Sequence, residues 1–228
     1  RVRFRLSLFY VNQSSTMLEF AHQEHVKSYY LDSRNQTFEL PPLTQQEEAD
    51  VCVIGAGFFG LSAALELAEK GKKVIVLEGA RVGFGASGRS GGQAINGFEE
   101  GIDEYVKQVG EDKAHKLWNM SLEAIDIIDE RIEKYGIQCD WKKGYATLAL
   151  NERRMDDLIE IEKESHENFG YQNMQLWDKA KLKQRLGSDI YVGGLYDSNS
   201  GHLHPLNYCL GLAKACLDLG VQIYEQSP

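Results

Sequence analysis

The sequence has no long hydrophobic run and no excess of positive charge. None of its apolar stretches approaches the ~18 consecutive residues that a membrane-spanning helix needs. The formal net charge at pH 7 is −9, and an acidic surface repels the phosphate backbone of a nucleic acid. We therefore expect neither a membrane span nor a nucleic acid partner.

Cysteine is also scarce, and its spacing matches no common metal or redox motif. The four cysteines form no C-x-x-C pair, and each has apolar neighbours, which is typical of a small buried hydrophobe. They are Cys52, Cys139, Cys209 and Cys216. We expect reduced structural thiols, no bound metal and a cytoplasmic protein.

The two ends of the sequence differ from the segments beside them. Residues 1–16 precede the first methionine, Met17, and their apolar run LSLFYV is too short for a secretory signal and lacks a cleavage site. We expect these residues to be an upstream extension, with translation starting at Met17. The segment GVQIYEQSP ends soon after an expected strand, so we also expect further sequence beyond Pro228.

The first clear structural pattern is a β-α-β unit that starts at Asp50. The apolar run at residues 50–54 predicts a buried strand, residues 58–70 have the apolar spacing of a helix, and residues 72–78 predict a second strand. Gly71 lies where such a helix ends. Strands joined in this way are parallel and belong to a covered sheet.

The rest of the sequence predicts alternating helices and strands. A long amphipathic helix is expected at residues 111–135, and capping residues Asn151 and Asp178 predict two further helices. The last helix is expected from Pro205 to just before Gly220. The expected strands are residues 144–150, 189–197 and 201–205, with a turn at SNSG joining the last two.

A glycine loop lies between the first strand of the β-α-β unit and its helix. Gly55, Gly57 and Gly60 form G-x-G-x-x-G, in which the glycines permit a tight turn, close approach of a pyrophosphate and close helix–strand packing. The helix N-terminus supplies free amides and a positive dipole to the phosphates. Glu78, at the end of the second strand, is placed to hydrogen-bond both hydroxyls of a ribose and disfavours a 2′-phosphate. The pattern predicts FAD or NAD and does not distinguish between them.

A second glycine-rich stretch, RVGFGASGRSGGQ, follows this acidic residue directly. Its five glycines, together with Ala86, Ser87 and Ser90, leave the backbone bare, so that amides and hydroxyls can contact an extended ligand. A dinucleotide that extends from Glu78 past the first loop would reach this stretch. The alternative is a flexible surface loop.

Together the two loops resemble the D-amino-acid oxidase type of FAD-dependent oxidoreductase, which includes glycine and sarcosine oxidases. The resemblance extends through VCVIGAGFFGLSAALELAEKGKKVIVLE and RVGFGASGRSGGQ to KSYY, ERIEKYGIQCD and SGHLHPLN. Among bacterial members of the family, the chain is similar to the gamma-glutamylputrescine oxidases. The resemblance implies an α/β fold: a Rossmann-type FAD-binding domain with an interleaved α+β substrate domain, here C-terminally truncated, because family members are longer.

This resemblance implies a division of the chain into four parts. Residues 1–48 would be an extension and arm, and residues 49–139 would be the N-terminal part of the FAD-binding domain. Residues 140–204 would begin the substrate domain. Residues 205–228 would form a helix and strand that return to the FAD-binding domain.

The resemblance also implies roles for residues of both loops. The first loop would hold the FAD pyrophosphate and Glu78 the adenosine ribose, with Arg81 near the adenosine end. The second loop would follow the pyrophosphate and ribityl chain toward the flavin. Some relatives attach flavin through a histidine in this loop, and Arg89 at the corresponding position excludes that attachment. The residues expected to contact FAD are Gly55, Gly57, Phe58, Phe59, Gly60, Glu78, Arg81, Ala86, Ser87, Gly91, Gly92 and Gln93.

The implied activity is oxidation of an amine C–N bond, with gamma-glutamylputrescine as the expected substrate. Oxygen would accept the electrons and form hydrogen peroxide. Because FAD carries out this chemistry, the activity needs no Ser/His/Asp or paired-carboxylate pattern. The alternatives are a glycine- or sarcosine-type oxidase, an amino-acid dehydrogenase, a nicotinamide enzyme, or a fragment that binds a dinucleotide without catalysis.

Three further side chains are candidates for the substrate cavity. His202 and His204 are two positions apart in GHLHP, so on a strand both would point to one face. There they would line the cavity or influence amine protonation, and the alternative is hydrogen bonding where the strand meets the helix. Arg89 could bind a substrate carboxylate with its planar fork or support the loop. No catalytic residue is identified from the sequence.

Overall fold

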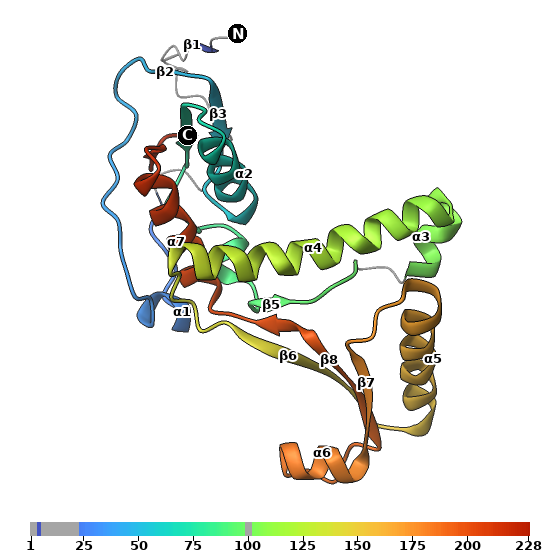
Figure 1. Ribbon diagram of the computed structural model, residues 1–228. Helices are drawn as coiled ribbons and strands as arrows, with labels where there is room; N and C mark the ends of the chain where they lie inside the picture. Colours follow the sequence, from blue (N-terminus) through green and yellow to red (C-terminus); the bar gives the residue numbers. More distant parts are fainter. Residues whose placement is uncertain (1–3, 6–22, 99–101) are drawn as a thin grey trace, which may run out of the picture. The chain divides into compact units, whose positions relative to one another are not determined.

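The computed structural model describes residues 4–5, 23–98 and 102–228 (Figure 1). The predicted start at Met17 and most of the predicted extension at residues 1–16 lie outside the described residues. The chain divides into two units. The first comprises Arg1–Gly92, Ile132–Cys139 and His204–Pro228, and the second comprises Gln93–Arg131 and Asp140–Leu203.

A parallel three-stranded sheet forms the centre of the first unit. Its strands are β3 (Val51–Ile54), β4 (Val74–Leu77) and β9 (Gln222–Tyr224), in the order β3-β4-β9. β3 and β4 are the strands of the predicted β-α-β unit and pair in parallel as expected. β4 is almost completely buried, because it is the central strand of a sheet on which helices pack. A separate short pair joins β1 (Phe4–Arg5) to β2 (Glu48–Ala49) in antiparallel orientation.

Two helices, α2 (Phe58–Glu69) and α7 (Pro205–Asp218), pack on each other and on this sheet. Gly71, just after α2, has a φ of +73°, a conformation that suits a glycine at a helix end. α7 is buried on all sides from Pro205 to Ala213, which is typical of a core helix. Both helices were predicted from the sequence, and both are confirmed.

None of the four cysteines, all of them within the described residues, forms a disulfide in the structure. Cys139, Cys209 and Cys216 are buried, and Cys52 is half-buried. Burial raises the pKa of the Cys52 and Cys209 thiols, so both stay protonated and unreactive at neutral pH. The cysteines therefore act as small apolar side chains.

A strand with three partners, β8 (Gly193–His202), organises the second unit. It pairs with β6 (Lys142–Ala149) along one edge and with β5 (Gln93–Ala94) and β7 (Met174–Asp178) along the other, all antiparallel. β8 runs through residues 198–201, where its pairing with β6 shifts register between the pairs Tyr145–Asp197 and Lys143–Gly201. The predicted turn at SNSG and the two separate strands beside it are therefore wrong.

Hydrogen bonds inside the second unit explain why the SNSG segment remains extended. The buried Asp197 carboxylate accepts hydrogen bonds from Tyr171 Oη at 2.7 Å and from Ser200 Oγ at 2.6 Å. The backbone N–H of Ser198 donates to the carbonyl oxygen of Asn173 at 3.1 Å. These residues have the composition of a turn, but their polar groups find partners in the strand and beside it.

Helices account for most of the remaining second unit. The side chains of Asn151 and Asp178 cap α5 (Glu152–Phe169) and α6 (Lys179–Leu186) as predicted, by accepting the backbone N–H three residues later. Leu158 of α5 packs with Ala149 and Leu195 in the core. α4 has the predicted bounds, and α5 and α6 begin directly after their predicted capping residues, whereas α3 was not predicted. The helices are α3 (Ile102–Val109), α4 (Glu111–Tyr135), α5 (Glu152–Phe169) and α6 (Lys179–Leu186).

The grouping of the residues after the second glycine loop differs from the expected division. We expected the FAD-binding part to extend to residue 139, but Gln93–Arg131 belongs to the second unit. Within that unit β5 pairs with β8, and the Gly97 N–H donates to Ser121 Oγ at 3.0 Å. Residues 205–228 belong to the first unit. The assignment of these ranges to a FAD-binding and a substrate domain stays a prediction.

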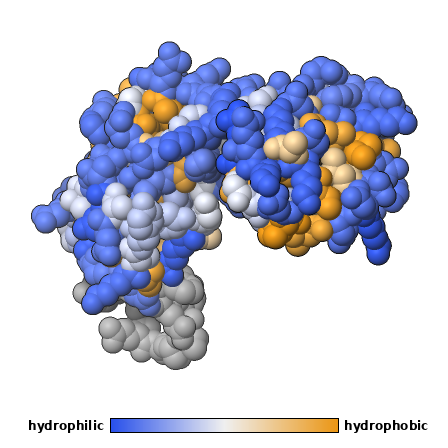
Figure 2. Space-filling view, turned by 90° about the horizontal axis from the view of Figure 1, so that it is seen from below, coloured by the Kyte–Doolittle hydropathy of each residue, from blue (hydrophilic) through white to orange (hydrophobic). Residues whose placement is uncertain are grey.

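The face of the molecule drawn in Figure 2 is largely hydrophilic. Figure 2 shows hydrophilic residues over most of the face in view, with smaller hydrophobic areas between them. Charged residues make up 26% of the sequence, which accounts for this distribution. Among the helices of the described residues, none is both long enough and apolar enough to cross a membrane.

The contact between α7 and Ile137 predicts a large effect from a small substitution. A Cβ on Gly211 would lie 2.2 Å from Cγ2 of Ile137, which is itself buried. We expect Gly211→Ala to lower the free energy of unfolding by about 1–3 kcal/mol, because a β-branched side chain in a packed core cannot rotate away. Chemical denaturation measures the change. Gly85→Ala is the control, since a Cβ there meets nothing within 4 Å, and equal stability of the two variants would contradict the prediction.

Candidate functional site

The first glycine loop, between β3 and α2, brings backbone segments very close together. Gly55 has a φ of +95°, a conformation that favours glycine. A Cβ on Gly60 would lie 2.0 Å from the carbonyl oxygen of Gly55, and a Cβ on Gly57 would lie 2.8 Å from Ser87 Oγ. Each glycine therefore meets the steric requirement of a dinucleotide-binding loop: a tight turn, an open backbone and close packing.

The first turn of α2 provides hydrogen-bond donors for an anion. The N–H groups of the first residues of a helix have no acceptor within the helix. Ser87 Oγ accepts one of them, the N–H of Phe58, at 3.0 Å. The other donors and the positive end of the helix dipole favour a phosphate at this position.

The Glu78 carboxylate connects the first glycine loop to the turn that precedes the second. Its Oε2 accepts the backbone N–H of Ala56 at 2.8 Å, and its Oε1 accepts the backbone N–H of Ala80 at 2.9 Å. Each oxygen of an ionised carboxylate has a further lone pair, so both can still accept a hydroxyl. Glu78 is therefore fixed by the backbone and remains able to bind the two hydroxyls of a ribose.

The second glycine loop repeats the geometry of the first. Gly83, Gly85 and Gly88 form another G-x-G-x-x-G, GFGASG, which leads into the short helix η1 (Ser87–Arg89). Gly83 has a φ of +71°, and a Cβ on Gly88 would lie 2.1 Å from the Gly83 carbonyl oxygen. The Gly83 N–H donates to the Ala56 carbonyl oxygen at 2.9 Å, which joins the two loops. This second pattern was not predicted, although the spacing of its glycines signals it.

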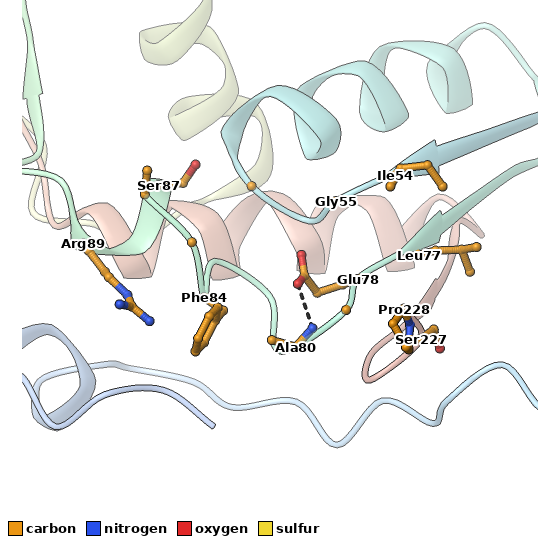
Figure 3. Close-up of a pocket in the computed structure, with 14 residues that line it drawn as sticks. Ile54, Gly55, Leu77, Glu78, Ala80, Phe84, Ser87, Arg89, Ser227 and Pro228 are labelled. Atoms are coloured by element: carbon orange, nitrogen blue, oxygen red, sulfur yellow. Dashed lines mark hydrogen bonds between the residues drawn. The ribbon is translucent and has the colours of Figure 1, made fainter. Parts of the chain in front are cut away.

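The two loops border a cavity of about 790 Å³ at the carboxyl ends of β3 and β4 (Figure 3). This edge of a parallel sheet is where open α/β folds bind their ligands, and the volume is that of a small-molecule or cofactor site. The cavity is lined by Ile54, Gly55, Gly57, Leu77, Glu78, Gly79, Ala80, Phe84, Gly85, Ala86, Ser87, Arg89, Ser227 and Pro228.

The cavity contains part of the set of residues predicted to contact FAD. The ring of Phe58 lies 5.6 Å from the ring of Tyr208, Phe59 is 89% exposed, and Gly60 is buried. At a helix N-terminus the backbone amides face an anion, so these side chains are free to point elsewhere. The predicted contacts that line the cavity are Gly55, Gly57, Glu78, Ala86 and Ser87, and those that do not are Phe58, Phe59, Gly60, Arg81, Gly91, Gly92 and Gln93, the last in the second unit.

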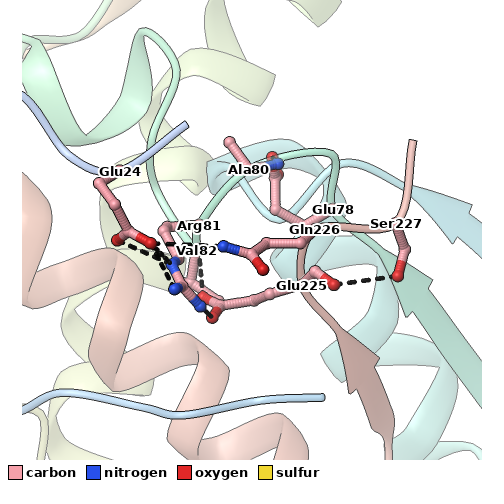
Figure 4. Close-up of polar contacts among 8 residues, drawn as sticks. All are labelled: Glu24, Glu78, Ala80, Arg81, Val82, Glu225, Gln226 and Ser227. Atoms are coloured by element: carbon pink, nitrogen blue, oxygen red, sulfur yellow. Dashed lines mark hydrogen bonds and ion pairs between the residues drawn. The ribbon is translucent and has the colours of Figure 1, made fainter. Parts of the chain in front are cut away.

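Arg81 does not line the cavity, because two carboxylates bind its guanidinium (Figure 4). Nη1 donates to Glu225 Oε2 at 2.8 Å, and Nε lies 3.0 and 2.9 Å from the two oxygens of Glu24. The hydrogen bonds to Glu24 and then to Glu225 raise the pKa of Arg81. The buried Glu225 also accepts the Val82 N–H at 2.8 Å. Arg81 therefore links the loop after β4 to these two acidic residues.

Several lining residues were not predicted. Ile54 and Leu77, the last residues of β3 and β4, supply apolar wall. Residues 227–228 also line the cavity, and they follow β9. Because the ends of parallel strands meet at one edge of a sheet, the position of β9 is the signal that could have identified them.

Arg89, which was a candidate for binding a substrate carboxylate, also lines the cavity. Its guanidinium lies 4.4 Å from the centroid of the Phe84 ring in a cation–π contact.

The predicted placement of His202 and His204 on one strand face is wrong. β8 ends at His202, which is exposed, and His204 is the N-cap of α7. His204 Nδ1 accepts the Asn207 N–H at 3.1 Å, which leaves the ring proton on Nε2, 3.0 Å from Ser33 Oγ. The buried His204 therefore hydrogen-bonds at the junction of strand and helix, the alternative raised above. Within the described ranges, no cluster of three or more His, Cys, Asp or Glu could hold a metal ion.

Substitution of Glu78 tests the geometry of the site. A glutamine keeps one oxygen, but its NH2 group would face the N–H of Ala56 or Ala80. We expect Glu78→Gln to lower the free energy of unfolding by about 1–3 kcal/mol and to weaken FAD binding about tenfold or more, because a backbone donor and a ribose hydroxyl lose their acceptor. Denaturation and equilibrium dialysis measure the two effects. Glu123→Gln, at an exposed position of α4, is the control, and equal FAD affinities of the two variants would contradict the assignment.

Sequence comparison with known proteins identifies the family of the chain. The sequence model of a family described as FAD dependent oxidoreductase matches residues 50–228. The chain is 91% identical over 212 residues to OrdL, a probable oxidoreductase of Haemophilus influenzae, which covers 93% of this chain and 49% of that protein. It is 43% identical over 204 residues to the gamma-glutamylputrescine oxidoreductase of Escherichia coli, which covers 90% of this chain and 48% of that enzyme. The chain thus spans about half the length of these relatives.

Solved structures share the fold. The L-amino acid deaminase of Proteus myxofaciens gives a TM-score of 0.68 at 24% identity, covering 85% of this chain and 42% of that one. The glycine oxidase of Bacillus cereus gives 0.59 at 21% identity, covering 78% of this chain and 47% of that one. The predicted α/β fold and the predicted cofactor, FAD, are confirmed. The chain belongs to the D-amino-acid oxidase type family of FAD dependent oxidoreductases.

Proposed function

We propose that the cavity between the two glycine loops holds the adenosine diphosphate half of FAD. In this arrangement Glu78 accepts hydrogen bonds from the ribose hydroxyls, and the first turn of α2 binds the diphosphate. The observation that carries the proposal is the Glu78 carboxylate, held by the N–H groups of Ala56 and Ala80 inside a cavity of about 790 Å³. The bare backbone at Gly57 and Gly85 leaves room for the ligand beside it.

We assign Arg89 to the diphosphate of FAD in preference to a substrate carboxylate. Among the lining residues Arg89 is the cation and Glu78 is the anion. Arg89 ends η1, which also contains Ser87, the acceptor for the first turn of α2. Arg89 is therefore two residues from Ser87, whose hydroxyl contacts the first turn of α2, where we place the diphosphate. Its planar guanidinium can bind two phosphate oxygens at once.

For the protein as a whole, we propose oxidation of an amine, with gamma-glutamylputrescine as the substrate. The support is the 43% identity, over 90% of this chain, to the Escherichia coli enzyme of that name. When bound, FAD supplies the two-electron acceptor for oxidation of a C–N bond. The net reaction converts the amine, oxygen and water into an aldehyde, ammonia and hydrogen peroxide, with two electrons and two protons passing from the amine to oxygen.

This chain contributes the adenosine end of the cofactor site to that reaction. Its cavity residues bind and orient through backbone amides, one carboxylate and one guanidinium, and we assign none of them a catalytic role. We also propose that the protein works in the cytoplasm with a small-molecule amine and oxygen as its partners. The free thiols support a reducing compartment.

Titration with FAD tests the role of Arg89. We expect Arg89→Ala to raise the Kd for FAD about tenfold to a hundredfold, because a charge-assisted hydrogen bond contributes about 1.5–3 kcal/mol. Quenching of flavin fluorescence measures the Kd. Arg153→Ala, at an exposed position of α5, is the control. An unchanged Kd together with a raised KM for the amine would instead assign Arg89 to the substrate.

An absorption spectrum of the FAD-loaded protein tests the substrate. We expect gamma-glutamylputrescine to bleach the flavin band without air, and oxygen to restore it with formation of hydrogen peroxide. Glycine, sarcosine and other amino acids are the comparison substrates. Bleaching by one of these alone would support the rival oxidases, and a flavin that oxygen fails to restore would indicate a dehydrogenase. FAD that binds and is bleached by none of these amines would contradict the proposed activity.

A further inference from the structure

The segment before the sheet, residues 23–47, is an arm outside the family match. The family match covers residues 50–228, so it does not include this arm. The arm contains α1 (Tyr29–Asp32) and belongs to the first unit, where it appears as the long blue segment of Figure 1. Its polar contacts include hydrogen bonds at the N-terminus of α7 and at the loops beside the cavity.

The strongest contact of the arm is made by Glu24. Arg81 donates to it from Nε, at 3.0 and 2.9 Å from its two oxygens, and from Nη2, at 2.5 Å from Oε1. Gln226 Nε2 lies 3.3 Å from the same Oε1. The hydrogen bond from Arg81 lowers the pKa of Glu24, so Glu24 is a carboxylate at neutral pH. One side chain of the arm thus binds residues from two different loops.

Those two loops form the wall of the cavity at its adenosine end. The Gln226 N–H donates to the carbonyl oxygen of Ala80 at 3.0 Å, and the Ser227 N–H donates to the carbonyl oxygen of Glu78 at 2.8 Å. Ala80, Glu78 and Ser227 all line the cavity. In Figure 4 the side chains of Glu24 and Arg81 lie beside this wall. Glu24 therefore acts on lining residues through Arg81 and Gln226.

The arm contacts the cavity wall at two more points. The Leu43 N–H donates to Ser227 Oγ at 2.8 Å. The ring of His25, next to Glu24, lies 6.3 Å from the ring of Phe84, the lining residue that holds Arg89 in cation–π contact. Burial, and then the positive charges of Arg34 and Arg89, lower the pKa of His25, so it is neutral at pH 7. A neutral ring adds no charge beside the guanidinium assigned to the diphosphate.

We propose that the arm is a clamp on the cofactor cavity and that Glu24 is its positioning residue. The inference rests on the proposed placement of FAD. Glu24 holds the loop after β4 and the loop after β9 together, so that the carboxylate of Glu78 and the backbone around it keep the geometry that a ribose requires. Glu24 does not line the cavity and acts only through its neighbours.

The expected effect is local, because Arg81 retains its second partner. An exposed ion pair contributes little to stability, and the Glu24 side chain is 65% exposed. Without Glu24, Arg81 still pairs with the buried Glu225 at 2.8 Å, so no buried charge is left alone. Removal of Glu24 should therefore loosen the two loops and leave the fold intact.

Glu24→Gln in the complete chain tests the clamp. We expect the Kd for FAD to rise about three- to tenfold and the Tm without FAD to stay unchanged, since the loss is confined to an exposed charge and its fork geometry. Hydrogen exchange of the Gln226 and Ser227 amides, measured without FAD, should become about three- to tenfold faster. Glu24→Asp, which keeps the charge, should restore part of the FAD affinity and part of the protection of the two amides. Glu39→Gln, at an exposed position of the same arm, is the control.

The outcomes separate the clamp from the proposed cofactor site. If the wild-type chain binds FAD and Glu24→Gln changes neither the Kd nor the exchange of the two amides, the clamp is wrong and the cofactor site stands. If Glu24→Gln lowers the free energy of unfolding without FAD by as much as it lowers the free energy of FAD binding, the clamp is also wrong. Glu24 would then be an ordinary stabilising residue. If the wild-type chain binds no FAD, the proposed site fails, and the cofactor role of the clamp fails with it.

Discussion

The hydrogen bonds between the Glu78 carboxylate and the backbone N–H groups of Ala56 and Ala80 are the constraint on which the site depends. β4 ends at Leu77, so the carboxylate lies at the carboxyl end of the central strand, between one glycine loop and the other. A carboxylate that is partly removed from water needs donors, and the turns before α2 and after β4 supply them from the backbone. One side chain therefore shapes both turns, and we propose that it marks the place of the ribose.

The second glycine loop borders the same cavity as the first. Because GFGASG repeats the close approach of GAGFFG, two bare turns face one cavity, and Arg89 ends the second of them. Among the cavity's lining residues, Glu78 supplies a carboxylate and Arg89 a guanidinium. A ribose diol and a diphosphate suit these two groups. Glu24 and Arg81 lie outside the cavity and affect it through the loops that they hold.

The sequence predicted the elements that local interactions determine. The β-α-β unit, α4 and the capped helices follow from apolar spacing and from side chains that act within a few residues. The continuous β8 could not be predicted, because the partners of its polar residues, Tyr171 and Asn173, come from another part of the chain. Arg81 was expected near the adenosine end of FAD, but its partners Glu24 and Glu225 are 57 and 144 positions away, and no local pattern indicates them. The glycine loops were identified because their function depends on backbone shape, which glycine spacing encodes.

A crystal structure of the chain grown with FAD tests the central claim most directly, because it locates the ribose relative to Glu78. The account predicts density for both ribose hydroxyls within hydrogen-bonding distance of the Glu78 carboxylate, with the diphosphate at the first turn of α2 and beside Arg89. Density for FAD at any other position, with the cavity between the two loops empty of ligand, would contradict it.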